Sequence, residues 1–210
     1  MATLLQLRTK LNGEIGVATD AETSPWGLAV RNNAIIDGYA DLWRVGVWKP
    51  TVQTIATVSD TWFYALTSIR RLDRVETIDS SSRIIETPKA VAQDDGAGSW
   101  QLRLVAPIGA GASLRVRGWG PYKSQFANDA DTDDLPAEHN RVPLLKAKAI
   151  LWRVQLAGFA RYGERQALAP EMNMTIDQLL AMVSAAEREY EDAARRLSTL
   201  RPRSGQTRRL

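Results

Sequence analysis

Residues 129 to 139, DADTDDLPAEH, gather the side chains that could bind a cation or move a proton: four aspartates, one glutamate and the single histidine of the chain. His139 has no second histidine or cysteine with which to share a transition metal, and no serine near it stands in a nucleophile context. We therefore interpret His139 as an exposed residue at a helix start, and not as a ligand or catalytic base.

The same segment matches a calcium-binding loop only in part. Counted from Asp129, the residues Asp131 and Asp133 fit the first oxygen positions, but Asp134 replaces the turn glycine and Asn140 replaces the closing bidentate glutamate. The match fails at the positions that matter most for calcium, so no metal site is predicted here.

A structural interpretation accounts for the segment better. Aspartates before a helix complement the positive end of its dipole, Pro136 suits a first helical position, and Glu138 lies where a first-turn acid stabilises a helix. The segment is therefore predicted to mark the return of the chain to helical structure.

No other stretch offers a catalytic or cofactor site. Asp94 and Asp95 belong to DDGAGS, a hairpin-like turn in which aspartate and glycine satisfy backbone geometry. The glycine-rich APIGAGAS lacks the lysine and the following helix of a phosphate-binding loop. We predict no catalytic residue, no metal and no cofactor, and expect a protein that is not an enzyme.

The composition is that of a folded protein made in a reducing compartment. Of 210 residues 44% are apolar and 24% charged, and there is no cysteine for a disulfide or a thiolate site. We find neither a signal peptide nor an apolar stretch long enough for a membrane span, so we expect synthesis in the cytoplasm and no membrane partner.

The basic character of the chain is concentrated at its end. The formal net charge is +3, and the last ten residues, RPRSGQTRRL, hold four arginines and no acid, so residues 1–200 carry −1 (+3 minus 4). Four arginines on phosphate give a salt slope of at most about −3.6, weak for one chain but large for many copies around one channel. A solvated tail without function is the alternative.

Periodicity predicts helices at both ends of the chain. Thr3 can cap a first helix from Leu4 to Ile15, and Ser24 can cap a second one that begins at Pro25 and ends near Trp43. Between residues 51 and 122 the period changes to two, with turn-rich breaks, which predicts five to eight short antiparallel strands in a small sandwich or barrel.

Two longer helices are predicted after the β region. Pro143 opens a broadly apolar helix that must be covered on more than one side, and Thr175 with Gln178 has the spacing of a capping box. The last helix has apolar residues at alternating spacings of three and four, namely Ile176, Leu179, Val183, Ala186, Tyr190, Ala193, Leu197 and Leu200. This seam indicates either a hairpin with residues 143–162 or a contact between subunits.

The predicted fold class is therefore α+β, a helical bundle with an inserted small antiparallel sandwich or barrel and a long C-terminal helix before a basic tail. The predicted domains are a helical core of residues 1–50 and 123–200, a β domain of residues 51–122, and a tail of residues 201–210.

In this order of elements the chain resembles the head-to-tail adaptor (connector) proteins of tailed bacteriophages. The stretches that carry the resemblance span residues 3 to 160, and they are LLQLRTKLN, SPWGLAVRNNAIIDGYADLWR, RRLDRVETI, RVRGWGPY and DDLPAEHNRVPLLKAKAILW. The resemblance implies a virion protein of the head–tail neck that is made in the host cytoplasm and forms a ring, commonly of twelve copies, below the portal. Its partners would be copies of itself, the portal, the next neck or tail protein (a stopper or a tail terminator), and the genomic DNA that passes through the channel.

Carried to this sequence, the resemblance assigns roles to two groups of residues. The C-terminal segment would dock on the portal through Arg201, Arg203, Arg208, Arg209 and Leu210. Contacts between subunits would use the helix from Pro143 and the heptad face, with Leu144, Lys148, Trp152, Leu179, Val183, Tyr190 and Leu197 as candidates.

Two other interpretations are kept. A tail or baseplate adhesin would bind a host surface sugar through Trp62, Trp100 and Trp119 of the β domain, although core packing explains large aromatics on alternating strands more simply. A small nucleic-acid-binding factor would use the arginine tail, and would bind duplex DNA tightly as a monomer with a steep salt dependence.

Overall fold

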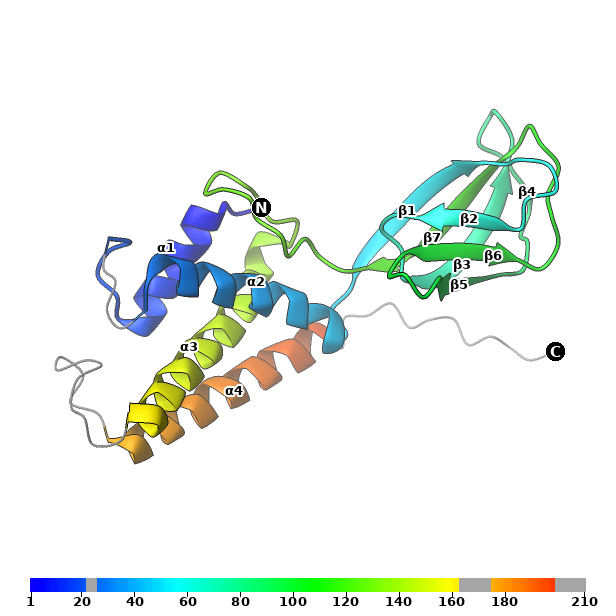
Figure 1. Ribbon diagram of the computed structural model, residues 1–210. Coiled ribbons are helices and arrows are strands. Elements are labelled where there is room, and N and C mark those ends of the chain that lie inside the picture. The colour runs from blue at the N-terminus through cyan, green and yellow to red at the C-terminus, as the bar shows by residue number, and fades with distance from the viewer. Residues whose placement is uncertain (22–25, 163–174, 199–210) are drawn as a thin grey trace. The chain divides into compact units, whose positions relative to one another are not determined.

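The computed structural model describes residues 1–21, 26–162 and 175–198, and over these it contains four α-helices and two small antiparallel sheets (Figure 1). The chain forms two compact units. We call Met1–Val47 together with the chain from Tyr122 through the last helix the helical unit, and Trp48–Pro121 the β unit. Because the β unit lies in sequence between the second and third helices, the predicted α+β class with an inserted antiparallel domain is confirmed.

The first two helices come from the N-terminal part of the chain. Helix α1 (Leu4–Ile15) begins with the predicted cap, because Thr3 accepts from the backbone N–H of Gln6 while the Gln6 side chain accepts from the N–H of Thr3. Helix α2 (Leu28–Arg44) begins later than predicted, since Gly27 is extended backbone at its N-cap. The predicted cap Ser24 and first residue Pro25 lie outside the described residues.

Helix α3 (Arg141–Tyr162) follows a short 3-10 helix, Ala137–His139. It begins two residues before Pro143, which is tolerated there because the first helical N–H groups have no partner within the helix. Pro136 is the residue before the 3-10 helix and not the first helical residue, so the predicted starting point is corrected. Helix α3 packs against α1, α2 and the last helix, which explains its apolar character on more than one side.

Helix α4 (Ile176–Ser198) pairs with α3 as a hairpin. Its predicted capping box is present, with 2.8 Å from the Thr175 N–H to the Gln178 carboxamide and 3.3 Å for the reciprocal bond. The residues buried in the hairpin are Leu179, Val183, Ala186, Tyr190 and Ala194. Ala194 replaces the predicted Ala193, because a straight α-helix has 3.6 residues per turn and drifts away from a strict heptad.

A tryptophan pair joins the start of α2 to α3 in the core of the helical unit. The indole N–H of Trp26 donates to the backbone carbonyl of Leu151 at 3.0 Å, and its ring meets Trp152 edge-on with centroids 4.9 Å apart. Both side chains are almost fully buried, so each contributes apolar burial while Trp26 leaves no unpaired donor.

The β unit consists of two facing sheets. Its strands are β1 (Lys49–Ala56), β2 (Phe63–Leu66), β3 (Arg71–Ile78), β4 (Ile84–Glu86), β5 (Ala90–Asp94), β6 (Trp100–Leu104) and β7 (Ser113–Gly120). One sheet has the order β1-β7-β3-β4 and the other the order β2-β6-β5 (Figure 1). All pairs are antiparallel, as in a small sandwich.

The core of the β unit lies between its sheets. Val75, Leu114 and Val116 of the four-stranded sheet form one cluster with Leu102 and Leu104 of the three-stranded sheet. Because side chains alternate along a strand, the residues next to these in sequence point away from the core. This alternation fixes which side chains form the outer surface of each sheet.

Candidate functional site

The acidic segment from Asp129 to Asp134 is tied to other parts of the helical unit. Asp129 receives two hydrogen bonds from the guanidinium of Arg8, at 2.8 and 2.9 Å. Asp133 accepts from the N–H of Ala2 and from the phenol of Tyr39, both at 2.6 Å. The aspartates of this segment thus bind partners that are far away in sequence, which the interpretation as a helix start did not include.

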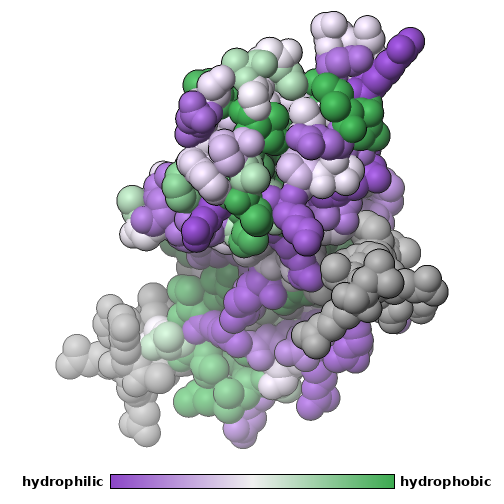
Figure 2. All heavy atoms as spheres, turned by 90° about the vertical axis from the view of Figure 1, so that its right-hand side faces the viewer, coloured by the Kyte–Doolittle hydropathy of each residue, from purple (hydrophilic) through white to green (hydrophobic). Residues whose placement is uncertain are grey.

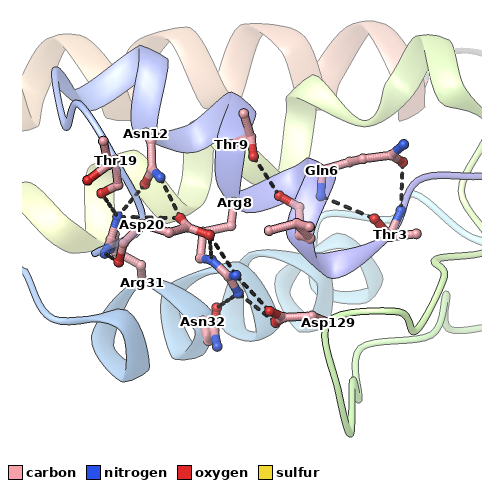
Figure 3. A network of polar contacts seen from close by, with 11 residues as sticks. Thr3, Gln6, Arg8, Thr9, Asn12, Thr19, Asp20, Arg31, Asn32 and Asp129 are labelled. Atoms are coloured by element: carbon pink, nitrogen blue, oxygen red, sulfur yellow. Dashed lines mark hydrogen bonds and ion pairs between the residues drawn. The ribbon is translucent and has the colours of Figure 1, made fainter. Parts of the chain in front are cut away.

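Arg8 is the centre of this polar network, which Figure 3 shows. Its side chain is almost fully buried, and the guanidinium lies between Asp129 on one side and Asp20 on the other. The Nε–H of Arg8 donates a hydrogen bond of 2.8 Å to the carboxylate of Asp20. Asn12 links Asp20 to Arg31, a second buried arginine. The network therefore fixes Asp20, which follows α1, and Asp129, which precedes α3, to helices α1 and α2.

The ion pairs change the acidity of these groups. The hydrogen bonds from Arg8 lower the pKa of Asp20 and of Asp129, and the same bonds raise the pKa of Arg8. Burial raises the pKa of Tyr39, and its bond to Asp133 adds to this effect. These charges are held in pairs by hydrogen bonds, as in a structural network of ion pairs.

A pocket of about 530 Å³ lies between α1 and the start of α3, with Lys10, Glu14, Glu138 and Arg141 in its wall. Glu14 is 3.4 Å from Arg141 and 3.3 Å from Lys148, so its charge is already neutralised by the chain itself. Nothing in this wall combines a nucleophile with a base.

Within residues 1–21, 26–162 and 175–198 there is no group of three or more carboxylate or histidine side chains placed to hold a metal ion. Over the same residues, no helix has both the length and the apolar character that crossing a membrane requires.

The residues predicted to contact another subunit lie largely inside the helical unit. Among them Leu144, Trp152, Leu179, Val183 and Tyr190 are buried by the packing of α3 with its neighbouring helices. The other two are less buried: Leu197 packs at the edge of the same core, and Lys148 is paired with Glu14. Their contact with a second subunit stays a prediction.

Apolar side chains that do reach the surface form separate groups between hydrophilic ones, as Figure 2 shows for one face. On the hairpin these are Val154 in the C-terminal half of α3 and Ile176 and Leu180 in the N-terminal half of α4, which are 47%, 52% and 46% exposed. Sequence periodicity placed Ile176 at the start of the heptad seam, and its exposure leaves it available for a contact with another subunit.

The outer surface of the four-stranded sheet carries a group of arginines that sequence reasoning missed. We call Arg71, Arg74, Arg115 and Arg117 the basic face; they come from the neighbouring strands β3 and β7. Alternation with Val75 and Val116 in the sequence could have revealed Arg74, Arg115 and Arg117, because residues that alternate with a buried series share the opposite face. Arg71 has the same parity as Val75 and joins the basic face only through the register shift between Leu72 and Arg74.

One carboxylate, Glu76, lies under the basic face with no exposed surface. A terminal guanidinium nitrogen of Arg74 lies 2.7 Å from Glu76 Oε1 and forms an ion pair with it, but its geometry does not meet that of a hydrogen bond. Arg117 and Arg115 approach its Oε2 at 3.4 and 3.7 Å. Three guanidinium groups thus share one carboxylate.

The three candidate tryptophans of the β unit do not form an exposed surface together. Trp119 is 7% exposed and packs against Trp48, Trp100 packs against the core, and Trp62 is exposed beside Phe63. The portal-docking candidates Arg201, Arg203, Arg208, Arg209 and Leu210 lie outside the described residues.

No family model matches the chain, and no curated protein matches it. Among solved structures, the chain is similar to one from the neck of an empty GTA particle computed with C6 symmetry, with 9% identity and a TM-score of 0.32, over 85% of this chain and 87% of that one. This degree of superposition is too low to establish a common fold, and it supports no functional inference.

Proposed function

We propose that this chain is a head-to-tail adaptor of a tailed bacteriophage, a structural protein of the virion neck that acts without catalysis. It forms a ring below the portal, joins the portal vertex to the next neck or tail protein, and lets DNA pass. The observation that carries the proposal is the order of elements: two helices, an inserted antiparallel β unit, then two longer helices. This is the order on which the resemblance in sequence rests.

Exposed apolar residues support the proposed ring. Val154, Ile176 and Leu180 lie on the two longest helices of a unit whose other large apolar side chains are mostly buried. A neighbouring copy that covers them gains apolar burial of about 1.5 to 3 kcal/mol for each residue fully covered. Contacts of one surface with a different surface of the next copy close into a ring when the rotation between copies is right.

The ends of the ring would bind different partners. The tail residues 201–210 would dock on the portal, where four arginines can pair with carboxylates, and the β unit would meet the next neck or tail protein. Repetition of each contact around a ring makes a weak single contact strong as a whole.

Native mass spectrometry of the full chain, alone and with portal rings, tests the proposal. We expect a ring, a multiple of the chain mass of 23.3 kDa, and a complex with one chain per portal subunit. Removal of residues 201–210 should abolish portal binding and leave the ring. A chain that stays monomeric and ignores the portal contradicts the proposal.

The ring contact has its own matched pair of variants. The double change Ile176→Ser with Leu180→Ser should shift the mass distribution from rings to monomers. The control, Val91→Ser with Val105→Ser, removes two equally exposed apolar side chains of the β unit and should leave the ring intact. Equal loss of the ring in both variants would show that general hydrophobicity, and not this helical surface, drives assembly.

A further inference from the structure

We infer that the basic face of the β unit binds the phosphate backbone of duplex DNA without reading its sequence. The inference deepens the proposed function, because it names the surface that contacts the DNA. It rests on that function only in taking the bound duplex to be the genomic DNA that passes through the ring. It moves the expected DNA contact from the C-terminal tail to the sheet.

The geometry of the sheet places the four arginines together. Arg74 lies opposite Arg117 in the β3–β7 register, Glu76 lies opposite Arg115, and Arg71 lies opposite Trp119. Neighbouring strands are about 4.8 Å apart, and alternate residues along a strand about 6.8 Å apart. The guanidinium groups therefore cover a compact area on one side of the sheet.

The charge on this face is unbalanced. The charged residues of β3 and β7 are the four arginines together with Asp73 and Glu76, which gives +2 (4 minus 2) for this pair of strands. Like charges directly opposite each other on paired strands are unfavourable, and the Arg74–Arg117 pair is such a case. Glu76 reduces this repulsion but cannot remove it, so an anionic partner would stabilise the face.

Arg71 extends the face toward two tryptophans. Its guanidinium stacks on the ring of Trp48, with 4.4 Å to the centroid, and Trp48 packs in turn against Trp119. Stacking of this kind fixes the orientation of a guanidinium while its N–H groups stay able to donate. Arg71 is exposed and makes no ion pair with Glu76, so it is the arginine best placed for an external anion.

Phosphate fits this surface better than the carboxylates of a second copy. The aspartates of the acidic loop of the helical unit are already bound within the chain, with Asp129 on Arg8, Asp133 on Tyr39 and Asp131 on the N–H of Ala127. Duplex DNA offers one negative charge per about 1.7 Å of axis, and arginine forks match phosphate oxygens.

The residues around the arginines explain why no sequence would be read. The outward positions of β1 are Pro50, Val52, Thr54 and Ala56, which lack the amide groups that recognise adenine edges. The arginines lie on a four-stranded sheet, which is wider than the two-stranded ribbon that the major groove admits, so they would contact the backbone. Such contacts position a duplex but carry no sequence information.

Fluorescence anisotropy with the full chain and a labelled duplex of mixed sequence tests the inference, over salt from about 50 to 200 mM. Arg71→Gln with Arg115→Gln removes the two arginines that hold Glu76 least, and should reduce the slope of log affinity against log salt by about 1.8. The control, Lys89→Gln with Arg103→Gln, removes the same charge from exposed residues outside the basic face and should leave the slope unchanged. Equal loss in both pairs overturns the inference.

Glu76→Gln gives a result of opposite sign. It removes the buried carboxylate that Arg74, Arg115 and Arg117 share and should tighten DNA binding, whereas a purely structural cluster would lose stability without any gain in affinity. Thermal unfolding of each variant separates misfolding from lost binding. Unchanged or weaker DNA binding by a folded Glu76→Gln protein overturns the inference, as does polyglutamate binding that depends on the same arginines while the duplex does not bind.

The two proposals can fail separately. Native mass spectrometry of the same variants reports ring formation and portal binding. Rings that bind the portal but no duplex overturn the DNA inference alone. Duplex binding that depends on the basic face, by a chain that forms no ring and ignores the portal, overturns the adaptor proposal and supports this site.

Discussion

The phenol of Tyr190 on α4 donates a hydrogen bond of 2.7 Å to Asp41 on α2, and so joins two helices that are far apart in the sequence. Burial raises the pKa of Tyr190, and the bond to Asp41 raises it further. Burial alone would raise the pKa of Asp41, but bonds from Tyr190 and Arg44 and the charge of Lys146 lower it. The carboxylate stays charged and keeps both helices in place.

Replacement of Tyr190 by Phe should destabilise the helical unit. The ring keeps its packing, but Asp41 loses one donor, and hydrogen bonds to charged groups contribute about 1.5 to 3 kcal/mol. We expect the lower end of this range, because Arg44 and Lys146 still contact Asp41. Urea unfolding followed by circular dichroism measures the change, with Ser184→Ala on the exposed side of α4 as control. An unchanged midpoint would mean that the bond contributes nothing.

Gly38 on α2 allows this helix to approach α3 closely. A Cβ atom at this position would collide with the backbone carbonyl oxygen of Pro143 and lie 3.1 Å from its carbonyl carbon. Gly38→Ala should therefore destabilise the unit by about 1 to 3 kcal/mol through overpacking. Gly13→Ala on α1 meets no atom within 4 Å, and should stabilise its helix by up to about 1 kcal/mol. Thermal unfolding of both variants checks the opposite signs.

The helices could be predicted because their signals are local. Thr3 with Gln6 and Thr175 with Gln178 satisfy each other within four residues, and both capping boxes are present. The predicted start of α2 at Pro25 was wrong. A serine–proline pair is a strong but purely local signal for a helix start, and Gly27, which follows it, adopts extended backbone.

The partners of the acidic segment could not be predicted in the same way. Asp129 meets Arg8, and Asp133 meets Tyr39, only after the helices have packed, and no spacing in the sequence marks these pairs. The basic face is an intermediate case. Its alternation is visible in RVRG, but the pairing of Arg74 with Arg117 depends on the strand register.

The cap of α4 offers a third test. Thr175→Ala removes the hydroxyl that accepts from the N–H of Gln178, and should cost about 1 kcal/mol of stability. Thr175→Ser keeps the hydroxyl and should behave like the natural chain. Hydrogen exchange of the first amides of α4 locates the effect. Equal exchange in the Ala and Ser proteins would contradict the cap.

Acid should weaken the network around Arg8 in a defined pH range. Arg8 lowers the pKa of Asp20 and of Asp129 in the folded chain below the ordinary value of 3.8. A lowered folded-state pKa means that the unfolded chain binds protons first as the pH falls. The stabilisation is therefore complete above pH 3.8 and is lost as the pH drops through the lower folded-state values.

Arg8→Met keeps a long apolar side chain and removes the guanidinium shown in Figure 3. The variant should be less stable than the natural chain at neutral pH, and the difference should shrink as the pH falls below 3.8, where the carboxylates become protonated. Urea unfolding at a series of pH values measures both curves, with Arg188→Gln on the exposed side of α4 as a control of equal charge. Parallel curves for the natural and Arg8→Met proteins would show that Asp20 and Asp129 titrate alike in the folded and unfolded chain, and that Arg8 holds the loop by packing alone.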